Sequence, residues 1–408
     1  MNSTQDLLSQ QKDSASQPML WEFVRLADYR VPSPVGASAA LEKWASLKRI
    51  FRGGDTDEQA PVKSEAELCV LSQSRLQHLA RPIDWRGAAA ALDTVLADWR
   101  RTGNPDTPVR FVVGQPHCGH PEILAHWAAR HRASRIDAPS VEQILGGDDR
   151  WLEGWPASTG PWVLAHLEHC YLRHAAGLGL VRRFLERAAN GALGRGVIAC
   201  DSWAWAYLRE VWPLPQPEAL TLQAFDGLRL SRYLAELVSR EDGACLQFCN
   251  ARTGKELRLE VGDAEASPEI SQLAAHCRGN IGSAWSSWRA SLRATPDQVE
   301  DSTQRPGEPQ AGAEIVWVSA ARKALALPAE KGEGLVFILH ALLLHNGLPA
   351  SLLPELLPQP AHRIASSLLQ LQALGVVVLA DERWRVSASA YALVREFLRH
   401  RGFLRDDF

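Results

Sequence analysis

The sequence predicts an α/β fold whose mainly parallel sheet is covered by helices on both faces. The first observation is that short apolar runs alternate with helical patterns between residues 105 and 225, as in parallel sheets. The second is that residues 226–294 are mostly helical in pattern. The third is that three helical patterns, a hairpin pattern and a last helix follow residue 313. The chain is thus expected to have several domains.

The net charge, the cysteines and the lack of long apolar runs limit the classes of function that the chain can have. The 408 residues carry a net charge of −3, which gives no general attraction to nucleic acid or anionic membranes. The seven cysteines include no C-x-x-C pair, so a disulfide framework is not expected and a reducing, cytoplasmic location fits best. No secretory signal is visible, and no run approaches the ~20 apolar residues of a membrane span.

The N-terminal part is expected to lack a sheet. Residues 1–17 are polar and predict a disordered tail. Residues 18–104 form an N-terminal helical segment, with helices expected over 37–50, 65–79 and 85–101. The first of these ends at Arg52-Gly53-Gly54, and glycine after a basic last turn is a helix stop signal.

The α/β core is expected over residues 105–225. Five strands are predicted from their apolar runs, over 109–113, 134–137, 161–165, 196–200 and 219–224. Helices are predicted between them, over 121–132, 141–145, 171–189 and 203–211. Ligands of parallel sheets bind beyond the carboxyl ends of the strands, which here are Gly114, Asp137, His166 and Asp201.

The rest of the chain predicts three further units. A helical lid over 226–294 has helices at 228–238, 267–278 and 281–293, with a hairpin between 245–250 and 256–261. A linker over 295–312 is polar and rich in Pro and Gly. The C-terminal unit, 313–408, has helices at 334–346, 350–357 and 362–374, strands at 376–380 and 383–386, and a helix at 389–399. Three helices followed by a two-stranded wing is the winged-helix order.

The loop after the first strand has the frame of a phosphate-binding loop. Gly114 and Gly119 stand at the spacing of G-x-x-x-x-G-K-[ST], after a strand and before a helix. The Lys position holds His120, which is shorter and mostly neutral at pH 7. The hydroxyl position for Mg²⁺ holds Pro121, which has no ligand atom and no N–H. The loop therefore keeps the glycine spacing of a phosphate-binding loop but lacks the residues that contact the phosphates and Mg²⁺.

Residues 105–408 resemble a P-loop ATPase of the AAA+/STAND type. The resemblance depends on this loop, on the apolar strand 162–165 at the Walker B place, on Asp201-Ser202 after a strand at the sensor place, and on Arg278-Gly279-Asn280 in the lid. It implies ATP or ADP as the cofactor. It also implies a degenerate nucleotide-binding set of Gly114, Gly119, His120, Pro121, His166, Glu168, Asp201, Ser202, Arg278 and Asn280.

The departures from this pattern argue against ordinary ATP hydrolysis. Walker B needs a carboxylate at the strand end, but Ala165 and His166 stand there and Glu168 is the nearest acid. We therefore expect no catalytic residues, no Mg²⁺, and a pseudo-ATPase that acts as a regulatory or scaffolding module through protein contacts. Nucleotide binding without hydrolysis stays open. So do an active or partner-activated ATPase, an oligomer, and a winged-helix DNA-binding regulator.

The winged-helix pattern favours a protein partner over nucleic acid. DNA-binding versions carry basic residues on the third helix, whereas 362–374 has only Arg363 as a fixed cation. The wing begins with two acids, Asp381 and Glu382. Binding to DNA phosphates usually needs a cluster of Lys and Arg, which the pattern does not supply.

Histidines and cysteines suggest one more alternative. Two loops that would be neighbours at one sheet edge carry nitrogen and sulfur donors suited to zinc. These donors are His117, Cys118, His120, His166, His169 and Cys170. No familiar zinc-site spacing is present, so the same residues also fit a role in the core or at the surface.

Overall fold

The computed structural model describes residues 19–32, 62–64, 67–102, 107–156, 160–211, 218–238, 246–259, 266–296, 314–319, 327, 334–403, 406 and 408. The predicted tail, the helix over 37–50 and nearly all of the linker lie outside these residues. Within them, no helix combines the length and the apolar character that crossing a membrane requires.

A six-stranded sheet forms the centre of the α/β core in the described residues, in the order β1-β7-β3-β6-β5-β4. Its last five strands run parallel, which confirms the predicted P-loop-like sheet. The antiparallel edge strand β1, followed by the short helix η1 (Leu26–Asp28), was not predicted. The strands are β1 (Phe23–Arg25), β3 (Val109–Gly114), β4 (Ser134–Ile136), β5 (Trp162–Leu164), β6 (Gly196–Asp201) and β7 (Ala219–Leu222).

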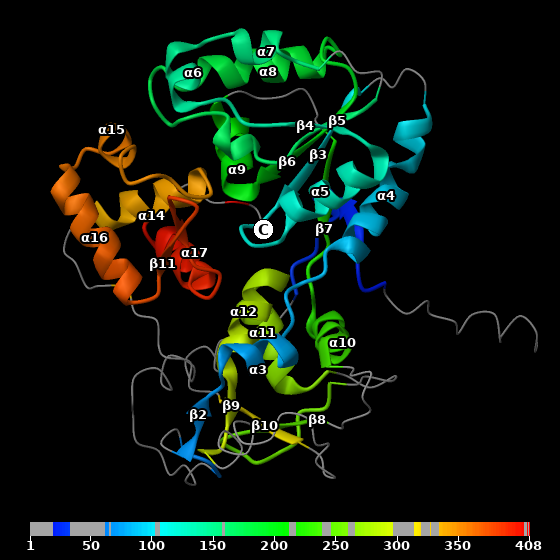
Figure 1. The fold of residues 1–408 in the computed structure, drawn as a ribbon, viewed down its shortest axis with the longest axis vertical. Helices are drawn as coiled ribbons and strands as arrows, with labels where there is room; N and C mark the ends of the chain where they lie inside the picture. The colour runs from blue at the N-terminus through cyan, green and yellow to red at the C-terminus, as the bar shows by residue number, and fades with distance from the viewer. Residues whose placement is uncertain are drawn as a thin grey trace, which may run out of the picture.

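Helices cover both faces of this sheet because its strands are apolar on both sides. On β6, Val197 and Ala199 face a core shared with α4 (Arg86–Arg101) and α5 (His120–His131). Ile198 and Cys200 face the opposite core. That second face is covered by α6 (Val141–Gly146), α7 (Arg150–Glu153), α8 (Gly179–Ala189) and α9 (Ser202–Val211), and Figure 1 shows α6 to α8 together at the top of the view.

Two predicted helices are shorter than expected. The helix over 171–189 begins only at Gly179, after a 3-10 turn η3 (Leu167–His169). The reason is a tight turn in which Gly177 donates to the carbonyl of His174 and accepts from the amide of Leu172. The helix over 65–79 is α3 (Gln73–Leu79), which Ser72 caps, and a strand precedes it.

That strand, β2 (Cys69–Val70), belongs to a second sheet, whereas the sequence predicted a mostly helical lid with one hairpin. The described residues form it in the order β2-β9-β10-β8. The predicted hairpin partner of β8 is reduced to one bridge between Cys249 and Glu256, and β8 pairs in parallel with β10 on its other side. The elements of the lid are α10 (Gly227–Val238), β8 (Leu246–Asn250), α11 (Pro268–His276), α12 (Ile281–Ser291), β9 (Leu292–Ala294) and β10 (Glu314–Val318).

The C-terminal unit has the predicted order of three helices, a hairpin and a final helix. Its first helix is buried on nearly every side. The unit shares one apolar core with the sheet, and Tyr171 donates across the junction to the carbonyl of Leu344 at 2.8 Å. The elements are α14 (Gly334–Leu344), α15 (Leu353–Leu356), α16 (Ala361–Ala373), β11 (Val377–Ala380), β12 (Arg383–Val386) and α17 (Tyr391–His400).

Candidate functional site

The loop between β3 and α5 is shaped by close packing around its glycines. Gly119 caps α5 with a φ of +71°, a conformation that side chains with a Cβ rarely adopt. A Cβ placed on Gly119 would lie 2.2 Å from Cζ2 of Trp85, and one on Gly114 would lie 2.6 Å from Nδ1 of His120. The predicted strand–turn–helix is present, and the chain's own side chains require both glycines.

His120 stands in the first turn of α5 and is only 3% exposed. Neither ring nitrogen has a hydrogen-bond partner in the part of the chain that the structure describes. Burial, with smaller effects from neighbouring charges, lowers the pKa of His120 to about 4. The ring is therefore neutral at pH 7 and supplies no positive charge at the place where a phosphate-binding lysine would stand.

The lid lies directly against this loop. The side chain of Asn280 donates from Nδ2 to the carbonyl of Pro116 at 2.7 Å and caps α12 by accepting from the amide of Ser283. A Cβ on Gly282 would lie 1.9 Å from the carbonyl oxygen of His117. The first turn of α12 thus contacts the backbone of the loop and leaves no gap between them.

The last described residues, Asp406 and Phe408, lie between the loop, the sheet and the lid. Figure 1 marks this end of the chain with the letter C, between the α/β core, the lid and the C-terminal unit. The carboxylate of Asp406 accepts from Ser202 at 2.5 Å, from Tyr391 at 3.2 Å and from Arg395 at 3.0 Å. The Phe408 oxygen accepts from Arg278 at 2.6 Å and also from Arg395. Two residues of the predicted nucleotide set, Ser202 and Arg278, therefore bind this segment.

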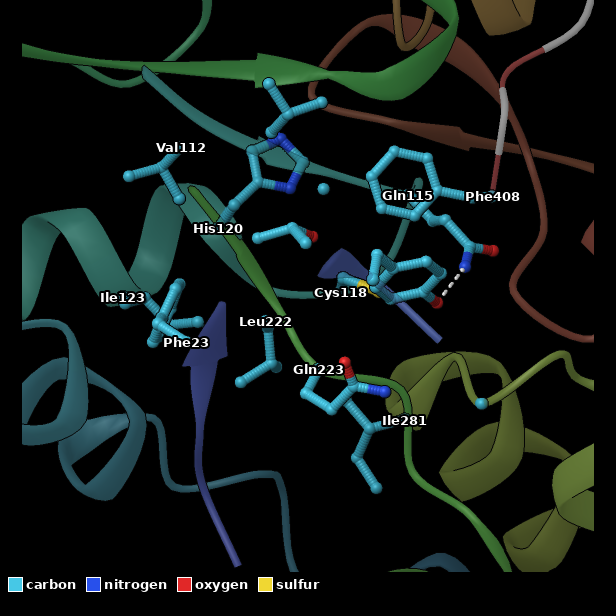
Figure 2. A pocket seen from close by; sticks show the side chains of 15 residues that line it. Phe23, Val112, Gln115, Cys118, His120, Ile123, Leu222, Gln223, Ile281 and Phe408 are labelled. Carbon is cyan, nitrogen blue, oxygen red and sulfur yellow. Dashed lines mark hydrogen bonds between the residues drawn. The ribbon is translucent and has the colours of Figure 1, made fainter. Parts of the chain in front are cut away.

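Little open volume remains beside the loop. Figure 2 shows the pocket, in which the amide of Gln115 donates to the hydroxyl of Tyr29 at 3.1 Å and the ring of Phe408 lies close by. The rings of Tyr29 and Phe408 pack with centroids 4.7 Å apart. The cavity volume is about 10 Å³ for the centre of a water-sized sphere, which suits one water molecule. Ligand pockets usually measure about 300 Å³ or more.

A second polar cluster lies at the carboxyl ends of β5 and β6. Glu168 is fully buried, and its carboxylate accepts from Nδ1 of His166 at 2.9 Å and from the amide of Asp201 at 3.1 Å. The rings of His166 and His169 stack with centroids 4.7 Å apart. Burial, followed by the charge of Glu168, raises the pKa of Asp201 well above its usual value, so Glu168 is the ionised carboxylate of the pair.

The predicted site residues thus separate into groups. Gly114, Gly119, His120, Pro121 and Asn280 surround the loop, Ser202 and Arg278 hold the Asp406–Phe408 segment, and His166, Glu168 and Asp201 form the polar cluster. Among the described residues, the predicted metal donors His166 and His169 come together with Glu168, whereas His117, Cys118, His120 and Cys170 do not join them. Tyr29, Trp85, Asp406 and Phe408 were missed because their distance along the chain gives no local signal.

No protein-family model matches the chain, and no curated protein matches it in sequence. Its structure is similar to Cdc6p from Pyrobaculum aerophilum at 13% identity and a TM-score of 0.29, over 85% of this chain and 100% of that one. It is also similar to the Walker-type ATPase paby2304 of Pyrococcus abyssi at 10% identity and a TM-score of 0.27, over 84% and 99%. A katanin structure described for self-assembly matches at 13% identity and a TM-score of 0.28, over 72% and 98%. These scores are too low to support a functional conclusion, and the P-loop-like fold is taken from the sheet itself.

Proposed function

We propose that this protein is an ATPase-like module that does not hydrolyse ATP and acts by binding a protein partner. The observation that carries the proposal is that the phosphate-loop site is filled by the chain's own atoms. The segment of Asp406 and Phe408 lies there, held by Ser202, Arg278 and Arg395. A nucleotide would have to displace this segment.

The residues of the loop support the same proposal. Hydrolysis depends on a cation at the terminal phosphates and on a ligand for Mg²⁺. His120 is buried and neutral, and Pro121 has neither a hydroxyl nor an N–H. Any affinity for nucleotide would therefore lack the strongest contacts of this class of site.

The nucleotide part is tested by ATP titration calorimetry and by phosphate release with Mg²⁺. We expect no heat of specific binding at micromolar ATP and no phosphate release above the buffer rate. Turnover by the wild type that Glu168→Gln abolishes, while the exposed control Glu122→Gln keeps it, would show an active ATPase and contradict the proposal.

An exposed apolar surface supports the partner role. Leu369 on α16 is 61% exposed and Leu379 on β11 is 52% exposed, with Leu374 and Val378 also exposed. α16 and β11 pack against each other, and exposed apolar side chains on neighbouring elements are typical of protein-binding surfaces. The same helix α16 carries a single Arg or Lys, Arg363, which is too little charge for binding a DNA backbone.

The partner part is tested by affinity capture from native extract with matched variants. Leu369→Asp and Leu379→Asp are expected to lose a protein that the wild type retains. Val70→Asp is the control, because Val70 is 72% exposed but lies on β2 in the other sheet. Equal capture by all variants contradicts the surface, and a salt-dependent mobility shift with duplex DNA would favour the DNA-binding alternative.

A further inference from the structure

The side chain of Glu168 is an unusual feature of the core. It is 0% exposed, and buried carboxylates are normally paired with a cation or bound to a metal. Among the residues that the structure describes, its ion-pair partner is a histidine, His166, and no lysine or arginine lies within ion-pair distance. The nearby Arg383 donates instead to the carbonyl of Gly347, at 3.2 and 2.9 Å.

A second buried carboxyl group lies beside Glu168. Asp201 is also 0% exposed, its amide donates to Glu168, and its Oδ2 has no hydrogen-bond partner among the described residues. Asp201 is therefore a close neighbour of Glu168, but it is not one of the three clustered donors.

The donor geometry suits a metal ion. One ligand atom from each of His166, Glu168 and His169 lies within 4.8 Å of the others. Ligands about 2.0–2.2 Å from zinc at tetrahedral angles are roughly 3.3–3.6 Å apart. Binding therefore requires the stacked rings of His166 and His169 to turn so that a nitrogen of each faces the same ion. Nε2 of His169 is buried without a hydrogen-bond partner in the described residues. The side chain of His166 is 37% exposed, which gives an ion a path from solvent.

The nearby sulfur atoms do not belong to this set. Cys170 directs its Sγ at the carbonyl of His166, at 3.5 Å, and its side chain lies in the apolar core. Cys118 lines the pocket beside the loop. The ligand set is therefore two imidazoles and one carboxylate, which is typical of zinc and of ferrous iron.

We propose that His166, Glu168 and His169 bind one divalent transition-metal ion, with open coordination positions toward solvent. The ion neutralises the buried carboxylate of Glu168 and fixes the turn η3. That turn touches the C-terminal unit, because Nδ1 of His345 lies 3.4 Å from the carbonyl of Glu168 and Nε2 accepts from the amide of Arg173. The site shares His166 and Glu168 with the degenerate nucleotide-binding set, but metal binding there does not require the proposed function.

The experiment is a Co²⁺ titration of the full chain after treatment with a chelator, with zinc content measured on the untreated protein. We expect one equivalent of Co²⁺ to give visible d–d absorption without a sulfur-to-cobalt charge-transfer band, and Zn²⁺ to displace it. Glu168→Gln and His169→Gln should each weaken binding by at least ~100-fold, since each removes a direct ligand whereas losing an outer-shell partner costs about 10–100-fold.

Controls separate ligand loss from misfolding. His166→Gln changes a partly exposed ligand and should also weaken binding, with circular dichroism confirming that the variant is folded. Cys170→Ala and the exposed His126→Gln should bind Co²⁺ as the wild type does. No uptake of Co²⁺ or Zn²⁺ by the wild type overturns the proposal. Unchanged affinity in Glu168→Gln and His169→Gln, or a charge-transfer band that Cys170→Ala removes, also overturns it.

Discussion

At the scale of single residues, the phosphate-loop frame is occupied by side chains that pack rather than bind anions. His120 takes the place of a lysine, and its ring contacts the position where a Gly114 side chain would project. Both ring nitrogens are buried without hydrogen-bond partners in the described residues. Such burial stabilises the neutral ring over the charged one.

This burial predicts an acid-sensitive fold. The pKa of His120 is about 4 in the folded protein and near 6.5 when unfolded, so the unfolded chain binds more protons between these values. The free energy of unfolding should therefore fall as the pH drops from 6.5 toward 4, by up to about 1.4 kcal/mol per pH unit for this group. Urea unfolding at a series of pH values measures the slope.

Two variants on the same helix, α5, test this pH dependence. His120→Gln removes one titrating group and should lower the slope between pH 4.5 and 6.5 by up to about 1.4 kcal/mol per pH unit. Part of the slope should remain, because burial also lowers the pKa of His117 and of His345 to about 4. His126→Gln, on the exposed face of α5, should leave the slope as in the wild type. Parallel slopes for all three proteins would contradict this account of His120.

Gly119 gives a second prediction at this scale. Gly119→Ala should destabilise the protein by more than about 2 kcal/mol, because a left-handed φ costs roughly 1–2 kcal/mol and the new Cβ meets Trp85. Gly146→Ala is the control, since its Cβ would have no heavy atom within 4 Å. Chemical denaturation of both variants measures the difference, and equal stability would contradict it.

At the scale of elements, the final helix holds the segment that closes the site. Arg395 on α17 is buried and pairs with the buried Asp406 at 3.0 Å. Asp406→Asn should cost about 3 kcal/mol, because it leaves a buried guanidinium without its counter-charge. Thermal or urea unfolding tests this value.

The control for this pair lies on the same helix. Glu396 pairs with Arg399 at the surface, and exposed pairs contribute about 0–1 kcal/mol. Glu396→Gln should therefore change the free energy of unfolding by less than about 1 kcal/mol. If the two variants are equally stable, the buried pair does not anchor the segment.

The sequence predicted the elements of the main sheet well, for a physical reason. Strands such as 109–113 are continuous apolar runs, and helices such as 85–101 have an apolar stripe, so each element can be recognised from its own residues. β2 has two residues and pairs with β9, more than two hundred positions away. No local pattern encodes such a pairing, and the second sheet was missed.

In the candidate site too, features formed by adjacent residues could be predicted, whereas contacts between distant residues could not. The glycine spacing and the altered residues His120 and Pro121 were readable because they are adjacent in the chain. The pocket is lined by Tyr29 and Phe408 beside the loop, and only the folded chain brings these distant positions together. His166 and His169 were among the predicted metal donors, but Glu168 was not, and the sequence did not show that Glu168 is buried beside them.

At the scale of the whole molecule, the α/β core and the C-terminal unit behave as one body. They share a continuous apolar core, and Trp203 donates to the hydroxyl of Tyr391 across it at 3.1 Å. The lid has a core of its own, built on the second sheet. Cooperative unfolding should follow these cores rather than the order of the chain.

Hydrogen exchange can test this division. Leu339 on α14 is fully buried, and Leu339→Ala should cost about 2–5 kcal/mol. Amide exchange should then accelerate in β3 and β6 as much as in α14, and less in β10 of the lid. Acceleration confined to the C-terminal unit would show that the two parts unfold separately.

The second sheet also bears on how far the lid can turn. The chain passes between the lid and the rest of the molecule four times: from β1 to β2, from α3 into α4, from β7 into α10, and from β10 toward α14. A body attached by one hinge can rotate through a large angle, since only a few residues absorb the change. A body attached at four points must move all four connections together. The lid is accordingly built to hold one orientation over the loop, and a partner would meet a rigid surface rather than a swinging arm.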